Sequence, residues 1–456
     1  MYDLENYINK KFESKENEKL KQDDLQDFFL LCQKVKSCFY SEWENRENSR
    51  SELEIQKRAI IGYEKEKLFF INRITDLIKE LSAEKTVFPS WYNNLEEALY
   101  HEIWGLAGIS EWFGKEYQNS SSAKIIGDKI FFMEHGHMVL KPQTISMERK
   151  DQLIKSFLLL TPEERMDKSY YELYLLDGTR VTIFTEPMAK KGQSAIVFRR
   201  YLIPSLTFEE QAFRGTIPFK IIPLLKAMVA VGYNVVFLGA VRTAKTTFLS
   251  TWQGYENPAL EGVMVETDPE IPLHKILPNA PILQLIADGD SLASISKNLL
   301  RSDADYFILA EARDGIALDT AVKIASKGTK RMKLTFHSRR PSAFPLEAAT
   351  EIVKQTGGDL HLTMQMVASS FDFLFHFVQL EDKSQKRLKG IYQMNCSKEG
   401  KIDIHPICEY RQDRNDWIIF DNITDDALTY GRESNAVAFN IMMSEIKKLS
   451  SMSEIR

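Results

Sequence analysis

The segment Asn234–Leu249, NVVFLGAVRTAKTTFL, constrains the fold of this 456-residue chain more than any other stretch. NVVFL predicts a buried strand, a turn of small residues begins at Gly239, and Lys245-Thr246-Thr247 opens a helix. Three further apolar runs, GVMVE, YFILA and MKLTF, follow it, and each ends in a turn or helix signal. Strands that alternate with helices predict a mostly parallel sheet covered by helices, which is the α/β fold class.

The turn between this strand and this helix carries the groups that bind a phosphate chain. Phosphates need backbone N–H donors, the positive end of a helix dipole, a lysine for the β and γ phosphates and a hydroxyl for Mg²⁺. Gly239, Lys245 and Thr246 fill these roles in a relaxed form of the pattern G-x-x-x-x-G-K-[ST]. Ala244 stands where that pattern has its second glycine, and we expect its Cβ to crowd the loop or the nucleotide. The predicted nucleotide-binding residues are Gly239, Arg242, Thr243, Ala244, Lys245, Thr246 and Thr247.

Charged side chains stand at the ends of three other predicted strands. Glu266 ends GVMVE, Glu311 follows YFILA, and His337 follows MKLTF. The carboxyl ends of parallel strands meet at the edge where ligands bind. A carboxylate there can hold Mg²⁺ through water, a second can activate the attacking water, and an imidazole can contact the γ-phosphate. Each residue alone could be an ordinary surface or structural residue, but together they predict a site for ATP hydrolysis.

The residues that precede this predicted sheet show different patterns of apolar and polar residues. Residues 1–84 contain no proline and one glycine and carry apolar residues at helical spacing, which predicts a small helical N-terminal extension. Residues 86–203 mix helix and strand patterns, with Asp177-Gly178 as a tight hairpin turn, and predict an α+β N-terminal domain. Residues 204–216 are a predicted linker, and residues 217–456 the predicted ATPase domain.

Composition excludes several classes of function. The net charge of −5 gives no global basic field, and no local basic patch stands out, so we expect no direct nucleic-acid binding. The first residues alternate acids, amides and lysines, which is not typical of an export signal. The longest uncharged apolar stretch, residues 227–241, is shorter than the roughly 20 residues of a membrane helix. We therefore expect a cytoplasmic protein that meets the inner face of the membrane through partners.

At these motifs the sequence resembles the secretion-superfamily traffic ATPases, nearest the Tad-pilus and type IV secretion branch, over roughly residues 95–395. The family's V-E-x-x-x-E-L motif is matched by Val265, Glu266, Glu270 and Ile271. Its L-R-x-x-P-D, G-E-x-R and histidine motifs are matched by Leu300, Arg301, Asp305, Glu311, Arg313, Gly328, Thr335 and His337. The arginines that the family's N-terminal domain presents to the nucleotide correspond to Arg180, Arg199 and Arg200.

This resemblance implies a RecA-like P-loop ATPase domain that binds ATP and Mg²⁺. It also implies a homo-hexamer of two tiers that works on a membrane-embedded platform in type II or type IV secretion, conjugation or pilus assembly. In that mechanism Lys245 and the loop amides hold the phosphates, while Thr246 and Glu311 organise Mg²⁺ through water. Glu266 orients or deprotonates the attacking water. The remaining expected catalytic groups are His337, Arg313 and Arg301, with Arg180, Arg199 and Arg200 closing onto the developing charge.

Four positions depart from the family pattern. These are Ala244, Ala304, Ala310 and Thr329. The charged groups survive, so we expect an active but slow ATPase. One alternative is a nucleotide-binding structural subunit that has lost hydrolysis. A second is a RecA-like nucleic-acid translocase, whose hydrolysis would be stimulated by DNA or RNA.

Overall fold

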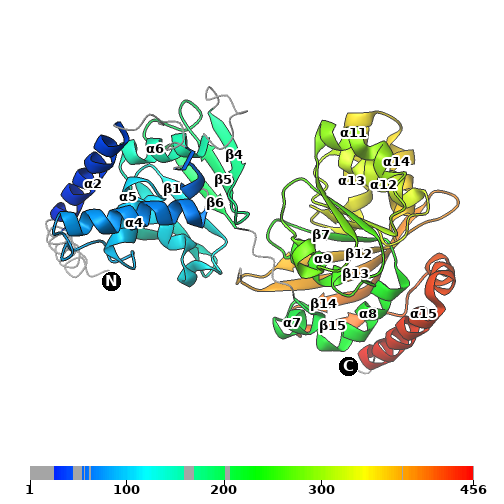
Figure 1. The fold of residues 1–456 in the computed structure, drawn as a ribbon. Coiled ribbons are helices and arrows are strands. Elements are labelled where there is room, and N and C mark those ends of the chain that lie inside the picture. Colours follow the sequence, from blue (N-terminus) through cyan, green and yellow to red (C-terminus); the bar gives the residue numbers. More distant parts are fainter. Residues whose placement is uncertain are drawn as a thin grey trace, which may run out of the picture. The chain divides into compact units, whose positions relative to one another are not determined.

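The computed structural model describes residues 25–44, 54–55, 57–60, 63–158, 169–200, 206–382 and 384–454. Parts of the predicted helical extension and the start of the predicted linker lie outside these ranges. The chain divides into two compact units, Met1–Leu202 and Ile203–Arg456. Each unit contains its own sheet (Figure 1). No helix in the described ranges is both long enough and apolar enough to cross a bilayer.

The first part of the N-terminal unit is a helical cluster. It comprises α2 (Gln26–Glu44), α4 (Glu64–Glu80) and α5 (Leu95–Ile103). The apolar stripes of these helices share one core, in which the Phe39 ring lies 5.9 Å from Phe70 and 4.4 Å from Trp104 between centroids. Because α5 and Trp104 belong to this core, the helical packing continues past residue 84, where we had placed the end of the helical extension.

The second part of this unit is a six-stranded antiparallel sheet in the order β3-β2-β1-β6-β5-β4. Its strands are β1 (Ser122–Ile126), β2 (Lys129–Glu134), β3 (His137–Thr144), β4 (Tyr170–Tyr174), β5 (Arg180–Phe184) and β6 (Ala195–Arg199). The helix α6 (Met147–Leu158) and the short 3-10 helix η1 (Ala107–Phe113) pack on its apolar face, and η2 (Lys115–Tyr117) follows η1. Asp177-Gly178 does form the turn between β4 and β5, where Gly178 has φ of 83°.

The C-terminal unit is built on a nine-stranded sheet in the order β15-β14-β13-β12-β7-β11-β10-β8-β9. The six strands from β12 to β9 in this order are parallel, and β13, β14 and β15 are antiparallel. The strands are β7 (Val235–Gly239), β8 (Gly262–Glu266), β9 (Ile282–Ile286), β10 (Tyr306–Ala310), β11 (Lys333–Phe336), β12 (Phe373–Gln379), β13 (Lys386–Cys396), β14 (Ile402–Arg411) and β15 (Asp416–Ile419). The predicted α/β class is confirmed.

Helices cover both faces of this sheet. Successive residues of a strand point to opposite sides, so each strand contributes to both cores. Val235 and Phe237 of β7 enter the core that α8, α9 and α15 complete, whereas Val236 and Leu238 enter the core that α11, α12, α13 and α14 complete. Figure 1 shows α8 and α15 together and α11 to α14 grouped apart from them. The helices are α8 (Ile222–Val231), α9 (Lys245–Gln253), α10 (Leu273–Ile276), α11 (Gly289–Leu299), α12 (Gly315–Ser326), α13 (Phe344–Thr356), α14 (Leu360–Ser370) and α15 (Asp425–Glu454).

The described part of segment 204–216, which we had expected to be a linker, contains the helix α7 (Phe208–Phe213). Thr207 caps this helix, because its hydroxyl accepts from the Glu210 amide while the Glu210 carboxylate accepts from the Thr207 amide. Phe208 is fully buried and its ring stacks on Tyr255 at 4.4 Å. This helix is therefore packed into the core of the C-terminal unit.

Candidate active site

The turn after β7 is as tight as the sequence predicts. Gly239 has φ of 149°, and a Cβ there would come within 2.4 Å of the Phe377 carbonyl oxygen and 2.6 Å of Thr243 Oγ1. Only glycine fits between the neighbouring strand and the loop. The Thr243 hydroxyl donates to the Ala240 carbonyl at 2.9 Å and closes the turn from inside.

Ala244 adopts the left-handed conformation that glycine would have at this position. Its φ and ψ are 74° and 21°, and Arg242 also has a positive φ of 65°. For an L-residue with a Cβ this conformation costs roughly 1–2 kcal/mol. Ala244 is the N-cap of α9, and no side chain caps that helix. The first-turn amides of α9, which include those of Thr246 and Thr247, therefore face the loop at the positive end of the helix dipole, as an anion site requires.

Lys245 lies almost completely buried at the start of α9. Its ammonium donates to the Ala240 carbonyl at 2.9 Å and lies 3.3 Å from His337 Nδ1. Burial lowers the pKa of Lys245 to about 8. Burial, and then the Lys245 charge, lower the pKa of His337, so the imidazole is neutral at pH 7 and Nδ1 can accept from the ammonium. The structure thus brings together these two predicted site residues.

Glu266 ends β8 and is buried beside the loop. One carboxylate oxygen accepts from the Ile271 amide at 2.9 Å and from the Glu270 amide at 3.2 Å. Burial raises the pKa of Glu266 to about 8 in spite of these two hydrogen bonds. A carboxyl group whose pKa lies near the working pH suits proton transfer from water.

Glu311 follows β10 directly and lies beside Glu266 at the same edge. Ala310 pairs with Glu266 in the parallel register of β10 and β8, so both carboxylates stand at neighbouring strand ends. Glu311 has φ of 59°, and its amide donates to the Thr335 hydroxyl at 2.6 Å. Its carboxylate is paired with Arg313, whose guanidinium also lies 3.8 Å from Asp268.

Three carboxylates of this edge could hold a divalent cation together. Asp268, Glu270 and Glu311 each offer an oxygen, and these oxygens lie within 4.8 Å of one another. Hard oxygen ligands at this spacing fit Mg²⁺. Asp268 and Glu270 lie in the turn after β8, and neither was predicted from the sequence as a metal ligand. The D-x-E spacing behind a buried strand is the signal that could have indicated them.

Arg301 is not brought to this cluster. It is exposed and precedes β10, whereas Glu311 follows that strand. A five-residue strand is about 16 Å long, so the two side chains start from opposite edges of the sheet.

The three N-terminal arginines lie in the other unit, where two of them have local partners. Arg180 pairs with Glu172 at 2.5 Å. The guanidinium of Arg200 lies 4.1 Å from the centre of the Trp112 ring and donates to the Tyr117 carbonyl at 3.1 Å. Arg199 is exposed on β6 and pairs in register with Arg180.

Several solved structures are similar to this chain. The VirB11 ATPase from the Brucella suis type IV secretion system is 15% identical with a TM-score of 0.33, and the match covers 62% of this chain and 92% of that one. The Yersinia pseudotuberculosis ATPase DotB is 16% identical with a TM-score of 0.47, over 80% of this chain and 89% of that one. The pilus retraction motor PilT, solved with bound ADP, is 13% identical with a TM-score of 0.40, over 74% and 86%. No family model and no curated protein matches the sequence.

These three solved proteins are a type IV secretion ATPase, an ATPase and a pilus retraction motor. At these identities and TM-scores the fold assignment rests on the chain's own geometry. The loop between β7 and α9 and the parallel order β12-β7-β11-β10-β8 carry that assignment. The C-terminal unit of this chain has the RecA-like P-loop ATPase fold, as the sequence predicted.

Proposed function

We propose that this chain binds and hydrolyses ATP at the carboxyl edge of its parallel sheet. The observation that carries the proposal is the convergence of Lys245, His337 and the carboxylates of Glu266 and Glu311 around an uncapped helix N-terminus. A polyphosphate needs a buried cation and free amides, and water attack on it needs a base and a metal-binding carboxylate. This edge offers all four.

Each side chain has a distinct task in this proposal. Lys245 moves from the Ala240 carbonyl to the phosphates, and the first-turn amides of α9 donate to the same anion. Thr246 in α9 and Glu311 after β10 would hold Mg²⁺, with Asp268 and Glu270 as further oxygen ligands. Bound Mg²⁺ would neutralise charge on the phosphate oxygens. Glu266 accepts the proton of the attacking water, and Arg313 must leave Glu311 before that carboxylate can serve the metal.

We also propose that the chain works as a homo-hexameric motor on a membrane-embedded secretion or pilus platform, on the cytoplasmic side. The support is the sequence resemblance over roughly residues 95–395. In such a ring Arg180 and Arg199, with Arg200, would approach a nucleotide as subunits close. Sedimentation of the full chain should show a hexamer with ATP, and a monomer at all nucleotide concentrations would contradict this part of the proposal.

Steady-state hydrolysis by the full chain with Mg²⁺ tests the enzymatic proposal. Glu311→Gln keeps the shape but removes the charge, so turnover should fall by about 100-fold or more while ATP affinity stays within a few-fold. Glu347→Gln removes an exposed acid of α13 and should change neither quantity. Parent-level hydrolysis by Glu311→Gln would place the chemistry elsewhere.

A second candidate function is nucleotide binding without turnover. It is favoured by the pairing of Glu311 with Arg313 and by the strained Ala244 in the loop. Tight ATP binding by the parent chain together with no product after prolonged incubation with Mg²⁺ would support this candidate and contradict the first.

A further inference from the structure

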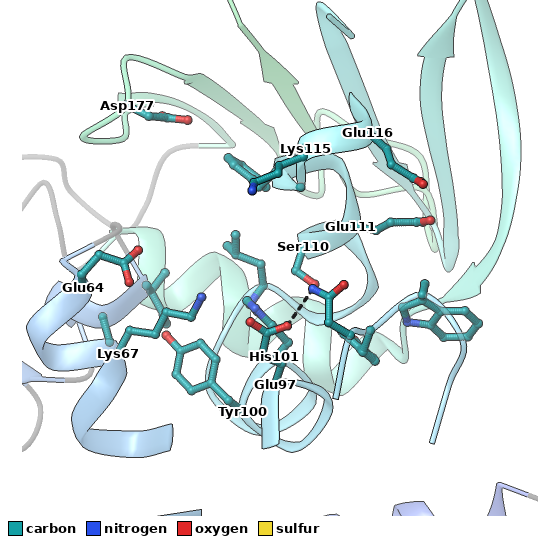
Figure 2. A pocket seen from close by; sticks show the side chains of 18 of the residues that line it. Glu64, Lys67, Glu97, Tyr100, His101, Ser110, Glu111, Lys115, Glu116 and Asp177 are labelled. Carbon is teal, nitrogen blue, oxygen red and sulfur yellow. Dashed lines mark hydrogen bonds between the residues drawn. The ribbon is translucent and has the colours of Figure 1, made fainter. Parts of the chain in front are cut away.

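The N-terminal unit contains a cavity of about 820 Å³ that the nucleotide chemistry does not use. It lies between the helical cluster and the β sheet. Its walls come from α4, α5, the η1 and η2 segments and the turn between β4 and β5 (Figure 2). Residues from both hydrophobic cores of the unit, such as Tyr100 and Leu175, line it. The cavity is therefore formed where two separately packed layers meet.

The charges that line this cavity are mostly negative. Its carboxylates outnumber its ammonium groups five to two. The carboxylates are Glu64, Glu97, Glu111, Glu116 and Asp177, and the ammonium groups are Lys67 and Lys115. His101 adds no charge at neutral pH, because burial lowers its pKa to about 3 and its Nδ1 accepts from the Leu106 amide. An occupant with positive charge is favoured electrostatically over a neutral or negative one.

Tyr100 supplies a polar group to the wall of the cavity. Its side chain is 1% exposed, and no hydrogen bond to its hydroxyl occurs among the residues that the structure describes. Figure 2 shows that hydroxyl on the side of the cavity where Glu64 and Lys67 lie. This hydroxyl is not one of the fully buried polar atoms that lack a partner, so it opens onto the cavity and can donate to or accept from an occupant. Burial raises the pKa of Tyr100, so the group stays a neutral donor and acceptor.

Aromatic rings complete the lining. Trp91, Tyr92 and Phe113 contribute ring surface in addition to Tyr100, and Tyr92 stacks against the His101 ring with an interplanar angle of 4°. A guanidinium is planar, stacks on such rings and forms two parallel hydrogen bonds with a carboxylate, whereas an ammonium is a compact, strongly hydrated charge. The volume exceeds that of one side chain, so backbone on both sides of the arginine also fits.

We propose that this cavity is a docking site for a segment of a partner protein that presents an arginine side chain. The guanidinium lies between the Glu64 carboxylate and the aromatic rings, and a polar group of the same segment takes the Tyr100 hydroxyl. The site lies wholly in the N-terminal unit and does not depend on nucleotide hydrolysis.

Fluorescence anisotropy of dye-labelled acetyl-tetra-arginine amide on the full chain at low salt tests this docking. Glu64→Gln should weaken binding about threefold, as for a charged pair at an exposed carboxylate. Tyr100→Phe keeps the ring and removes the hydroxyl, and should also weaken binding about threefold. Tetra-lysine should bind more weakly than tetra-arginine, and tetra-glutamate should not compete.

Glu148→Gln is the matched control, because this exposed acid of α6 carries the same charge and lies outside the cavity lining. It should leave the affinity unchanged. An equal loss in Glu148→Gln and Glu64→Gln would show that the peptide responds only to net charge and would overturn the proposal. Equal affinities for tetra-lysine and tetra-arginine, or no effect of Tyr100→Phe in a variant with an unchanged melting temperature, would also overturn it.

Discussion

Two buried lysines stand at opposite edges of the same parallel sheet, and they differ in their partners. Lys333 begins β11 and is fully buried, 3.4 Å from a Glu256 oxygen and 4.3 Å from the centre of the Tyr306 ring. Lys245 follows β7 at the other edge and has a carbonyl and an imidazole as its near partners. Burial lowers the pKa of each to about 8.

The comparison shows why burial or a shifted pKa alone does not identify a functional site. Lys333 has a carboxylate partner inside the protein, because Glu256 lies 3.4 Å away, although Glu256 also accepts from Arg331 at 3.1 Å and the Lys333 ammonium makes no hydrogen bond with the part of the chain that the structure describes. Within the described residues, no carboxylate lies within 4 Å of the Lys245 ammonium. A buried cation without an ion-pair partner is suited to an anion that arrives from outside. We therefore assign nucleotide binding to the edge that holds Lys245, which we call the binding edge. We assign stability to the edge that holds Lys333, which we call the structural edge.

The largest effect should come from Glu266→Gln at the binding edge. The amide cannot accept a proton from water, so turnover should fall by about 100-fold or more, while ATP affinity stays within a few-fold. Stopped-time hydrolysis assays and ATP titrations measure the two quantities. A parallel loss of affinity and turnover would show that Glu266 holds the loop instead of acting on water.

Lys333→Met should affect stability alone. Methionine fills similar volume, and Arg331 still neutralises Glu256, so the free energy of unfolding should fall by about 1–2 kcal/mol instead of the full cost of an orphaned buried charge. Urea denaturation measures this change. Lost ATP affinity in a folded Lys333→Met variant would break the distinction between the two edges.

Ala244→Gly should release the strain of the left-handed residue in the loop. Affinity for ATP should rise by about tenfold, since removal of roughly 1–2 kcal/mol of strain favours the cradle that the phosphates need. A fluorescent ATP analogue gives both dissociation constants. Weaker binding by the glycine variant would mean that the alanine methyl group is a useful contact.

Asp372→Asn should change how the free energy of unfolding depends on pH, through a carboxyl group at the structural edge. Asp372 precedes β12 and accepts from the Asn234 amide at 2.8 Å, and burial raises its pKa from 3.8 to about 7. The folded state therefore holds a proton that the unfolded state releases, so this contribution to stability is present below pH 3.8 and is lost as pH rises through 7. Because the side chain is only partly buried, we expect a loss of about 1 kcal/mol between pH 5 and 8. The variant should lose less over that range, and identical pH profiles would contradict this assignment.

The binding edge could be predicted from the sequence because it obeys local rules. Glu266, Glu311 and His337 each directly follow or end an apolar run, and parallel pairing then collects strand ends at one edge. Lys245 was found through the turn that precedes a helix. None of these predictions required knowledge of which distant segments of the chain contact each other.

The structural edge and the N-terminal cavity could not be predicted in this way. Glu256 and Lys333 are 77 positions apart, and nothing in either local sequence indicates their contact. Tyr100 fits the apolar stripe of α5, and only the packing of the helical cluster against the sheet makes it part of a cavity wall. Arg301 matched a family motif by spacing, but the strand that separates it from Glu311 directs it to the other edge.

ATP titration of the parent chain beside Lys245→Ala and Lys333→Ala tests the central claim most directly. The account predicts that Lys245→Ala lowers ATP affinity by about 100-fold or more, because the phosphates lose their buried ammonium, whereas folded Lys333→Ala keeps the parent affinity. Undiminished ATP affinity in Lys245→Ala would contradict the assignment of this edge as the nucleotide site.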